Sequence, residues 1–235
     1  MKRILVVVSI AISIFILVSC SSKNYVITSG YENMISDDAA ILIPPINITD
    51  VNDNLKIFSG EEIDEIKDNF NTAASDSLAE YMNVYSNSTA KFYHSDYRTA
   101  PQFEEKHMKV GGNEITLNIP VKTVQVDEEV TGNSFILLLE NSSITLDAGK
   151  DNSSAMPGMD GTTGATSANG KMKTSVVSLS MNINYVLYDN TNEQVAYYGM
   201  SHYRESFKKF EEVKSIIERG LKNISEEIIS NSPVK

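Results

Sequence analysis

The feature that most constrains the fold is a strict alternation of apolar and polar residues near position 180. Serine or asparagine separates the first five members of a series of apolar residues at odd positions: Val177, Leu179, Met181, Ile183, Tyr185 and Leu187. This period of two is typical of a β-strand with one buried face. Asp189–Glu193 then supplies turn-forming residues, so residues 194–203 are predicted to return as a partner strand. The sequence therefore predicts a long antiparallel hairpin.

Two amphipathic segments are predicted to be helices. Ser59-Gly60-Glu61-Glu62 has the form of a capping box, in which the serine and glutamate side chains satisfy amides at a helix start. Apolar residues then recur every three or four positions: Ile63, Ile66, Phe70, Ala73, Ala74, Leu78 and Tyr81. A similar stripe predicts a C-terminal helix that ends near Asn231 and Pro233: Phe210, Val213, Ile217, Leu221, Ile224 and Ile228. We interpret both stripes as faces packed on the core.

Shorter segments predict the remaining strands. Residues 39–46 form an apolar run closed by two prolines, and residues 90–97, 114–126 and 134–146 also have strand character, the last with a polar kink. The polar stretches 47–58 and 101–112 are predicted loops. The predicted fold class is α/β (α+β), with a mixed, largely antiparallel sheet and two long amphipathic helices packed on it.

The N-terminus resembles a bacterial lipoprotein signal. Lys2 and Arg3 precede the apolar run Ile4–Leu17, which is too short to span a bilayer comfortably. The run ends in Leu17-Val18-Ser19-Cys20, the form of a lipobox. The resemblance implies that residues 1–19 are removed and that Cys20 carries a diacylglycerol thioether and an acylated amino group. An ordinary secretory signal or an uncleaved N-terminal anchor is the alternative.

The predicted organisation after the signal peptide is a tether followed by one domain. Residues 20–38 are interpreted as a lipidated flexible tether, and residues 39–231 as a single α/β domain. Residues 147–173 are rich in Gly, Ser, Thr, Ala and Asn, a composition that predicts a disordered loop within that domain. Cys20 is the only cysteine, so the chain cannot form an intrachain disulfide.

Charge argues against nucleic acid as a partner. Without Lys2 and Arg3 the chain has 18 basic and 31 acidic residues, and such an acidic protein is repelled by phosphate backbones and by anionic headgroups. Membrane attachment is therefore expected to come from the lipid groups on Cys20. In the sorting rule of enterobacterial lipoproteins, Ser21 after the lipidated cysteine favours the periplasmic face of the outer membrane. The inner membrane and the cell surface stay open as alternatives.

The order of the predicted elements resembles the small α/β domains of envelope lipoproteins related to the N-terminal domain of the translocation protein TolB. These include the curli secretion lipoprotein and the outer-membrane activator of a penicillin-binding protein. The resemblance is carried by Ile41–Pro45, Asn133–Leu138, Met181–Asp189 and Val195–Gly199. It implies a domain without catalytic activity that presents a surface to partner proteins in the periplasm.

Tyrosines gather on the predicted hairpin and give a candidate partner-binding face. Alternation directs Tyr185 toward the core and Tyr188, with one of Tyr197 and Tyr198, toward the other side. We name Tyr188, Tyr197 and Tyr198 as this candidate face, because tyrosine rings are common at protein interfaces. Ordinary cross-strand aromatic pairing is the alternative explanation.

Groups for catalysis or metal binding are few. His94 and Asp96 have the spacing of two ligands on one face of a strand, and His107 or His202 could complete a zinc site, although surface histidines are the simpler reading. The adjacent carboxylates at 104–105, 127–129 and 211–212 are typical of solvated faces. We therefore predict no catalytic residue, no metal and no cofactor. Two functions stay open: an accessory or scaffolding lipoprotein that binds another envelope protein or itself, and a lipoprotein that binds or hydrolyses cell-wall glycan or binds a small ligand.

Overall fold

The computed structural model describes residues 23–32, 39–46, 48, 50–86, 90–126, 134–149 and 176–233. The predicted signal peptide, the lipobox Leu17–Cys20 and residues 150–173 of the predicted loop lie outside these residues. Within the described part of the chain, no helix is both long enough and apolar enough to cross a membrane.

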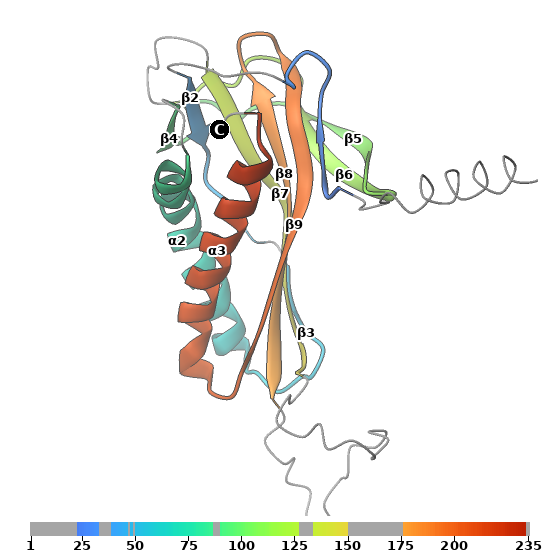
Figure 1. The fold of residues 1–235 in the computed structure, drawn as a ribbon. Coiled ribbons are helices and arrows are strands. Elements are labelled where there is room, and N and C mark those ends of the chain that lie inside the picture. The colour runs from blue at the N-terminus through green and yellow to red at the C-terminus, as the bar shows by residue number, and fades with distance from the viewer. Residues whose placement is uncertain are drawn as a thin grey trace, which may run out of the picture.

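A mixed sheet of seven strands forms the centre of the structure (Figure 1). Its strand order is β1-β9-β8-β7-β2-β4, and β3 pairs with the second half of β7. Strands β1, β9, β8 and β7 are successively antiparallel, whereas β2 is parallel to both β7 and β4. The strands are β1 (Tyr25–Ile27), β2 (Ala40–Ile43), β3 (Asp50–Asp53), β4 (Lys91–His94), β7 (Ser134–Ala148), β8 (Val177–Asp189) and β9 (Gln194–Phe207). The predicted fold class and the predicted β8–β9 hairpin are confirmed.

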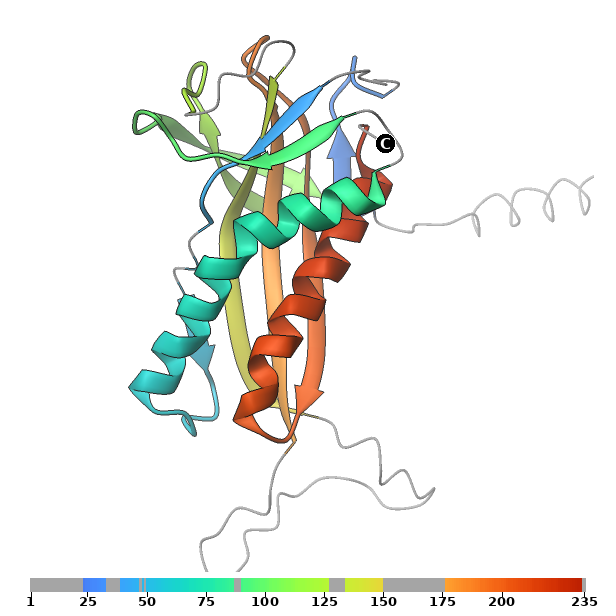
Figure 2. The same cartoon turned by 90° about the vertical axis from the view of Figure 1, so that its left-hand side faces the viewer.

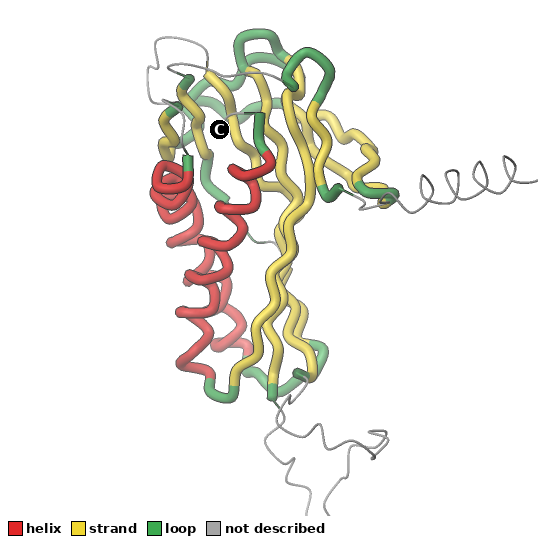
Figure 3. Tube along the Cα trace, in the orientation of Figure 1, coloured by secondary structure: helices red, strands yellow, loops and turns green. Residues whose placement is uncertain are grey.

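Two helices cover one face of this sheet, as Figures 2 and 3 show. Helix α2 (Gly60–Tyr85) starts with the predicted capping box: Ser59 Oγ accepts from Glu62 N at 3.2 Å, and Glu62 Oε2 accepts from Ser59 N at 2.8 Å. A short 3₁₀ turn, η2 (Phe210–Glu212), leads into α3 (Val213–Asn231). Helix α3 lies so close to the sheet that a Cβ at Gly220 would overlap Met181 and come within 2.7 Å of the Tyr203 ring.

The main core lies between the sheet and the helices. The six apolar odd-numbered residues of β8 are all buried on this side. They face the buried stripes of the two helices, which include Ile66, Phe70, Leu78, Ile217, Leu221 and Ile224. Each apolar side chain of this size removed from water contributes roughly 1.5–3 kcal/mol to folding.

A second core lies on the opposite face of the sheet, which we call the outer face. Strands β5 (Phe103–Val110) and β6 (Asn113–Pro120) form a separate antiparallel hairpin over its upper half (Figure 1). Residues from β6 are buried there against outward-facing residues of the central strands: Ile115, Leu117 and Ile119 against Ile136, Leu138, Val186 and Tyr188.

The prediction of a loop at residues 101–112 is wrong, because β5 occupies most of that stretch. Most side chains of β5 are exposed, and charged residues such as Glu104, Glu105 and Lys106 dominate its sequence. No apolar alternation therefore marks β5 as a strand. The strand predicted at 114–126 runs only as far as Pro120 in β6.

The predicted loop at residues 47–58 also contains a strand, β3, which pairs with β7 from Asp50–Ser143 to Asp53–Leu146. Only Val51 of its four residues is apolar, so no apolar pattern marks this stretch as a strand. Similarly, Asp147 and Ala148 belong to β7 rather than to the predicted loop, and they pair with Ser178 and Val177.

The prediction of a flexible tether over residues 20–38 does not hold for its middle part. Tyr25–Ile27 form β1 and pair with Tyr197–Gly199 of β9. Tyr31 is buried and donates a hydrogen bond to Asp189 Oδ2 at 2.7 Å. The folded domain therefore begins before residue 39, which is the start predicted from the sequence.

Candidate binding cleft

The predicted partner-binding face does not exist as an exposed surface. Tyr197 is fully buried on the helix side, where its hydroxyl lies 2.8 Å from that of Tyr185. Tyr188 is only 1% exposed and lies under the β5–β6 hairpin, and Tyr198 is half-buried in the same second core. The alternation correctly placed Tyr185 and Tyr188 on opposite faces. The error was to take the outer face as open.

Burial dominates the chemistry of these tyrosines. Burial raises the pKa of Tyr185 and of Tyr197 far above the usual value for a phenol. Burial also raises the pKa of Tyr188, with the Glu193, Asp189 and Glu104 carboxylates adding to the effect. The Tyr188 hydroxyl has no hydrogen-bond partner among the described residues. All three rings are parts of the core, which matches the alternative explanation of packed aromatic residues.

The three histidines are not brought together. His94 Nε2 lies 3.6 Å from Asp96 Oδ1, at the β4 edge of the sheet. His107 belongs to the separate β5–β6 hairpin, and His202 on β9 contacts Asn182 at 2.7 Å. The described residues contain no group of three His, Cys, Asp or Glu that could hold a metal ion. The zinc site considered from the spacing is therefore not assembled by these histidines.

The adjacent carboxylates do not converge on a reaction site either. Glu104 forms an ion pair with Lys106 at 2.6 Å, and Glu105 lies 3.8 Å from His107, all on exposed β5. Glu211 and Glu212 are exposed in η2. Residues 127–129 lie outside the described residues.

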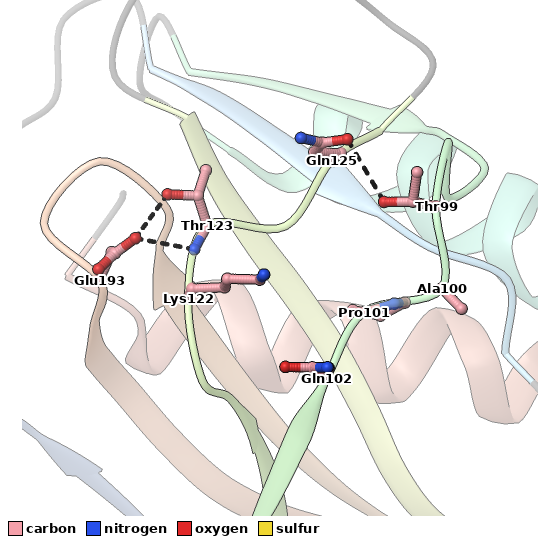
Figure 4. Close-up of a pocket in the computed structure, with 8 residues that line it drawn as sticks. All are labelled: Thr99, Ala100, Pro101, Gln102, Lys122, Thr123, Gln125 and Glu193. Atoms are coloured by element: carbon pink, nitrogen blue, oxygen red, sulfur yellow. Dashed lines mark hydrogen bonds between the residues drawn. The ribbon is translucent and has the colours of Figure 1, made fainter.

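A cleft of about 290 Å³ lies where the open end of the β5–β6 hairpin meets the β8–β9 turn. Figure 4 shows its three walls: the segment before β5, the segment after β6, and the turn. The lining residues are Thr99, Ala100, Pro101, Gln102, Lys122, Thr123, Gln125 and Glu193.

Backbone pairing holds the first two walls together. Val121 N donates to Gln102 O at 2.9 Å, and Arg98 N donates to Gln125 O at 3.0 Å. Next to Arg98 and Gln125 in the sequence, Tyr97 and Val126 form an isolated antiparallel bridge. These contacts continue the pairing of β5 and β6 beyond the ends of the strands, so the cleft stands on a fixed frame.

The β8–β9 turn is attached to this frame through side chains. Asn190 binds the backbone of Val124 twice, accepting from its N at 2.7 Å and donating to its O at 3.0 Å. Glu193 Oε1 accepts from Thr123 N at 2.9 Å and from Thr123 Oγ1 at 2.7 Å (Figure 4). These hydrogen bonds, with the nearby Lys122 charge, hold the pKa of Glu193 below its usual value.

Asp189 fixes the shape of the turn from beneath. Its carboxylate accepts hydrogen bonds from the backbone amides of Thr191 and Asn192, each at 2.9 Å, and from Tyr31 Oη at 2.7 Å. Burial acts to raise the pKa of Asp189, but hydrogen bonds from Asn192, Tyr31 and Thr191 outweigh it and hold the pKa below its usual value. The turn is therefore a rigid wall.

The chemistry of the cleft is that of binding. Its lining contains hydroxyl and amide groups, the Lys122 ammonium and the Glu193 carboxylate. This carboxylate already accepts a hydrogen bond from Thr123. Among the described residues, Lys122 forms no ion pair. Two apolar residues that are sequence neighbours of Lys122 and Gln102 are exposed: Val121 at 53% and Phe103 at 38%. Both threonine hydroxyls of the lining already donate hydrogen bonds, Thr123 to Glu193 and Thr99 to Gln125. The cleft thus combines polar groups with exposed apolar residues next to its lining in the sequence.

Sequence reasoning did not find this cleft. Its residues lie in stretches without a motif, and their positions become adjacent only through the pairing of residues 97–102 with 120–126. The one usable signal was the turn-forming sequence Asp189–Glu193. That signal located the third wall but gave no sign of what it faces.

No family model matches the chain, and no curated protein matches it. Among solved structures, it is similar to a neuraminyllactose-binding hemagglutinin homolog from Helicobacter pylori, with a TM-score of 0.38, 8% identity and 84% of each chain covered. It is also similar to PelC from Paraburkholderia phytofirmans, solved as a dodecamer, with a TM-score of 0.33, 8% identity, and 87% of this chain and 97% of that chain covered. At such low identity and TM-scores, these similarities assign neither a function nor a partner to this chain.

Proposed function

We propose that this protein is a lipid-anchored component of a bacterial envelope that binds another envelope protein through the cleft and has no catalytic activity. The lipobox sequence Leu17–Cys20 supports the anchor. The cleft and the exposed apolar residues next to its lining in the sequence support binding to a protein. The domain would thus hold a partner near the membrane to which Cys20 is attached.

The observation that carries the binding role is the pairing of a rigid polar cleft with exposed apolar side chains. Val121 and Phe103 are large exposed apolar residues next in sequence to Lys122 and Gln102 of the cleft lining. A protein partner can bury both of them, and its polar groups can meet the cleft donors, which is the usual composition of a protein interface. The Lys122 ammonium, which acts on Glu193 but forms no ion pair with it, favours a carboxylate of the partner at this point.

Cell-wall glycan is the second candidate, because the cleft is rich in hydroxyl and amide groups. Hydrolysis of a glycosidic bond needs two carboxyl groups on either side of the bond. The lining contains a single carboxylate, Glu193, and it accepts hydrogen bonds from Thr123. The lining also contains no aromatic ring. The cleft therefore fits a protein better than a sugar chain.

Crosslinking in intact cells tests the partner. A photoreactive residue at Phe103 should crosslink to one distinct envelope protein. The substitution Val121→Asp in the same protein should abolish that product, because it places a charge where the apolar contact forms. Val84→Asp is the matched control, since Val84 is 73% exposed on α2, and it should leave the product intact. Recovery of glycan only, of the chain itself only, or of a product insensitive to Val121→Asp would contradict the proposal.

Lipidation is tested separately. The intact mass of protein extracted from its own membranes should include a diacylglycerol group and an acyl chain on Cys20. The variant Cys20→Ala should leave the membrane fraction, because it cannot carry the lipid and the chain is acidic. An unmodified cysteine, or a Cys20→Ala variant that stays in the membrane fraction, would overturn the anchor.

A further inference from the structure

The proposed lipid site is separated from the folded domain by very few residues. The first backbone contact of the domain is made by Asn24, whose carbonyl accepts from Met200 N at 2.9 Å. Three residues lie between Cys20 and Asn24. Even fully extended, the four steps from Cys20 to Asn24 span at most about 14 Å. A lipid on Cys20 therefore keeps Asn24 close to the membrane surface.

The chain from Asn24 onward is firmly held in the sheet. Strand β1 pairs with β9 through Tyr25–Gly199, Val26–Tyr198 and Ile27–Tyr197. The Tyr25 and Tyr197 rings pack with centroids 5.8 Å apart. A Cβ at Gly199 would lie 2.6 Å from Asn24 O, so the two strands approach too closely for any larger residue there. Strand β1 is thus a fixed part of the domain and adds no length to the connection.

Strand β1 also marks one edge of the sheet, and β4 marks the other. Five intervals separate them in the order β1-β9-β8-β7-β2-β4, which at about 4.8 Å each gives a width of about 24 Å. The sheet is therefore wider than the connection to Cys20 is long. With the β1 edge held near the surface, the β4 edge can therefore lie beyond the reach of the connection, up to about the width of the sheet.

The charges at the β1–β9 edge fit a surface of lipid headgroups. Lys23 and Arg204 are both exposed, Lys23 just before β1 and Arg204 on β9. The nearest acidic residue along β9, Glu205, is paired with Arg219 at 2.6 Å. The Lys23 ammonium lies 5.4 Å from the centroid of the Tyr25 ring. Exposed cations near a membrane are attracted to lipid phosphates, whereas the chain as a whole is acidic.

From these observations we propose that the β1–β9 edge of the domain rests on the headgroups of the membrane, with the β4 edge directed away from it. This inference rests on the proposed lipidation of Cys20. The short connection keeps the β1 edge near the membrane, and the exposed cations at this edge favour its contact with the headgroups.

Site-specific quenching tests the orientation in the full lipidated protein. Cys20 is the only cysteine and is blocked by lipid under this proposal, so one introduced cysteine can be labelled alone. His202→Cys places a fluorophore on exposed β9, and Tyr93→Cys places it on exposed β4 as the matched control. In phosphatidylcholine vesicles with a quencher on the headgroup, the label at 202 should lose most of its emission and the label at 93 little.

Equal quenching at both positions, or stronger quenching at 93, would overturn the orientation. The intact mass of the same samples separates the two proposals: a lipidated chain with equal quenching overturns the orientation alone, and a chain without lipid overturns both.

Lengthening the connection tests its role. A flexible linker of about 20 residues placed between Ser22 and Lys23 has a mean span of about 25 Å and should reduce the contrast between positions 202 and 93. The same linker placed between Thr163 and Gly164 is the control and should leave the contrast unchanged. A contrast that survives the first insertion would overturn the role of the short connection.

Discussion

The two halves of the outer face of the sheet differ sharply, although the same strands build both. In the upper half, β7 and β8 direct apolar side chains outward, Ile136, Leu138, Val186 and Tyr188, and the β5–β6 hairpin covers them. In the lower half the same strands direct small polar side chains outward: Ser143, Thr145, Ser178, Ser180 and Asn182, of which Ser178 and Ser180 are buried. Figure 1 shows no described helix or strand over this lower half. The half that the β5–β6 hairpin covers is therefore the apolar one, and the other half is polar.

The change between the halves occurs at an irregularity in β7. The pairing with β8 shifts between Glu140 and Ser143, and Asn141 has a left-handed backbone with φ of 47°. The hairpin is attached at this same place: Asn141 Nδ2 donates to Thr116 O, and Asn118 Nδ2 donates to Glu140 Oε2, each at 2.7 Å. The bulge thus marks the boundary of the covered half.

The largest effect is expected for a truncation inside the covered half. Leu117 of β6 is fully buried in the second core. Leu117→Ala should lower the free energy of unfolding by about 2–5 kcal/mol, through lost burial and the cavity left behind. Urea denaturation of the two proteins measures it. A loss of less than about 1 kcal/mol would show that the hairpin is only loosely attached to the sheet.

A smaller effect is expected at the boundary. Asn141→Ala removes the hydrogen bond to Thr116 and puts alanine into a left-handed conformation, and should cost about 2 kcal/mol. Asn141→Gly removes the same hydrogen bond but tolerates the conformation, so it should cost less. Denaturation curves of both variants measure the difference. If glycine is no better than alanine, backbone strain does not contribute at this position.

The fold was predictable where one face of an element is uniformly apolar. The alternation from Val177 to Leu187 and the capping box at Ser59 located β8 and α2, because both depend on neighbours close in sequence. Strand β5 was missed because it is exposed and charged, and β3 because it has a single apolar residue. In β8, the continuous apolar run from Tyr185 to Tyr188 indicated a strand that is buried on both faces, and all four residues are buried. Tyr188 was nevertheless interpreted as exposed, although Tyr185 was correctly placed in the core.

The cleft could not be predicted for a different reason. Its walls come from residues near 100, near 123 and near 193, and only the pairing of the hairpin brings them together. The decisive contacts, such as Asn190 with the Val124 backbone, join a turn to a segment 66 residues away. Polar side chains without a motif carry no local signal of such a contact.

A pH-dependent effect is expected from Glu140 at the boundary. Burial raises the pKa of Glu140, while the hydrogen bond from Asn118 opposes the rise. Because the pKa of Glu140 is raised in the folded state, the charged carboxylate destabilises the fold at pH values above that pKa. This destabilisation disappears as the pH falls through the folded-state pKa toward 4.5. Glu140→Gln should therefore be at least as stable as the wild type at neutral pH and should lose this advantage on acidification.

Unfolding free energies of wild type and Glu140→Gln across this pH range measure the difference. Glu226→Gln, at an exposed position of α3, is the matched control for the loss of one acidic group. A wild type that is more stable than Glu140→Gln at neutral pH would show that the carboxylate gains more from Asn118 than it loses by burial.

The smallest effect is expected in the open half. Asn182 is exposed on β8. Among the described residues, its side chain forms a hydrogen bond only with His202. Asn182→Thr should change the free energy of unfolding by no more than about 0.5 kcal/mol, because the loss of one exposed hydrogen bond is offset by the strand preference of threonine. Denaturation under the conditions used for Leu117→Ala gives the direct comparison. A loss as large as that of Leu117→Ala would mean that a further part of the chain covers this half, and the contrast between the two halves would then be one of polarity and not of cover.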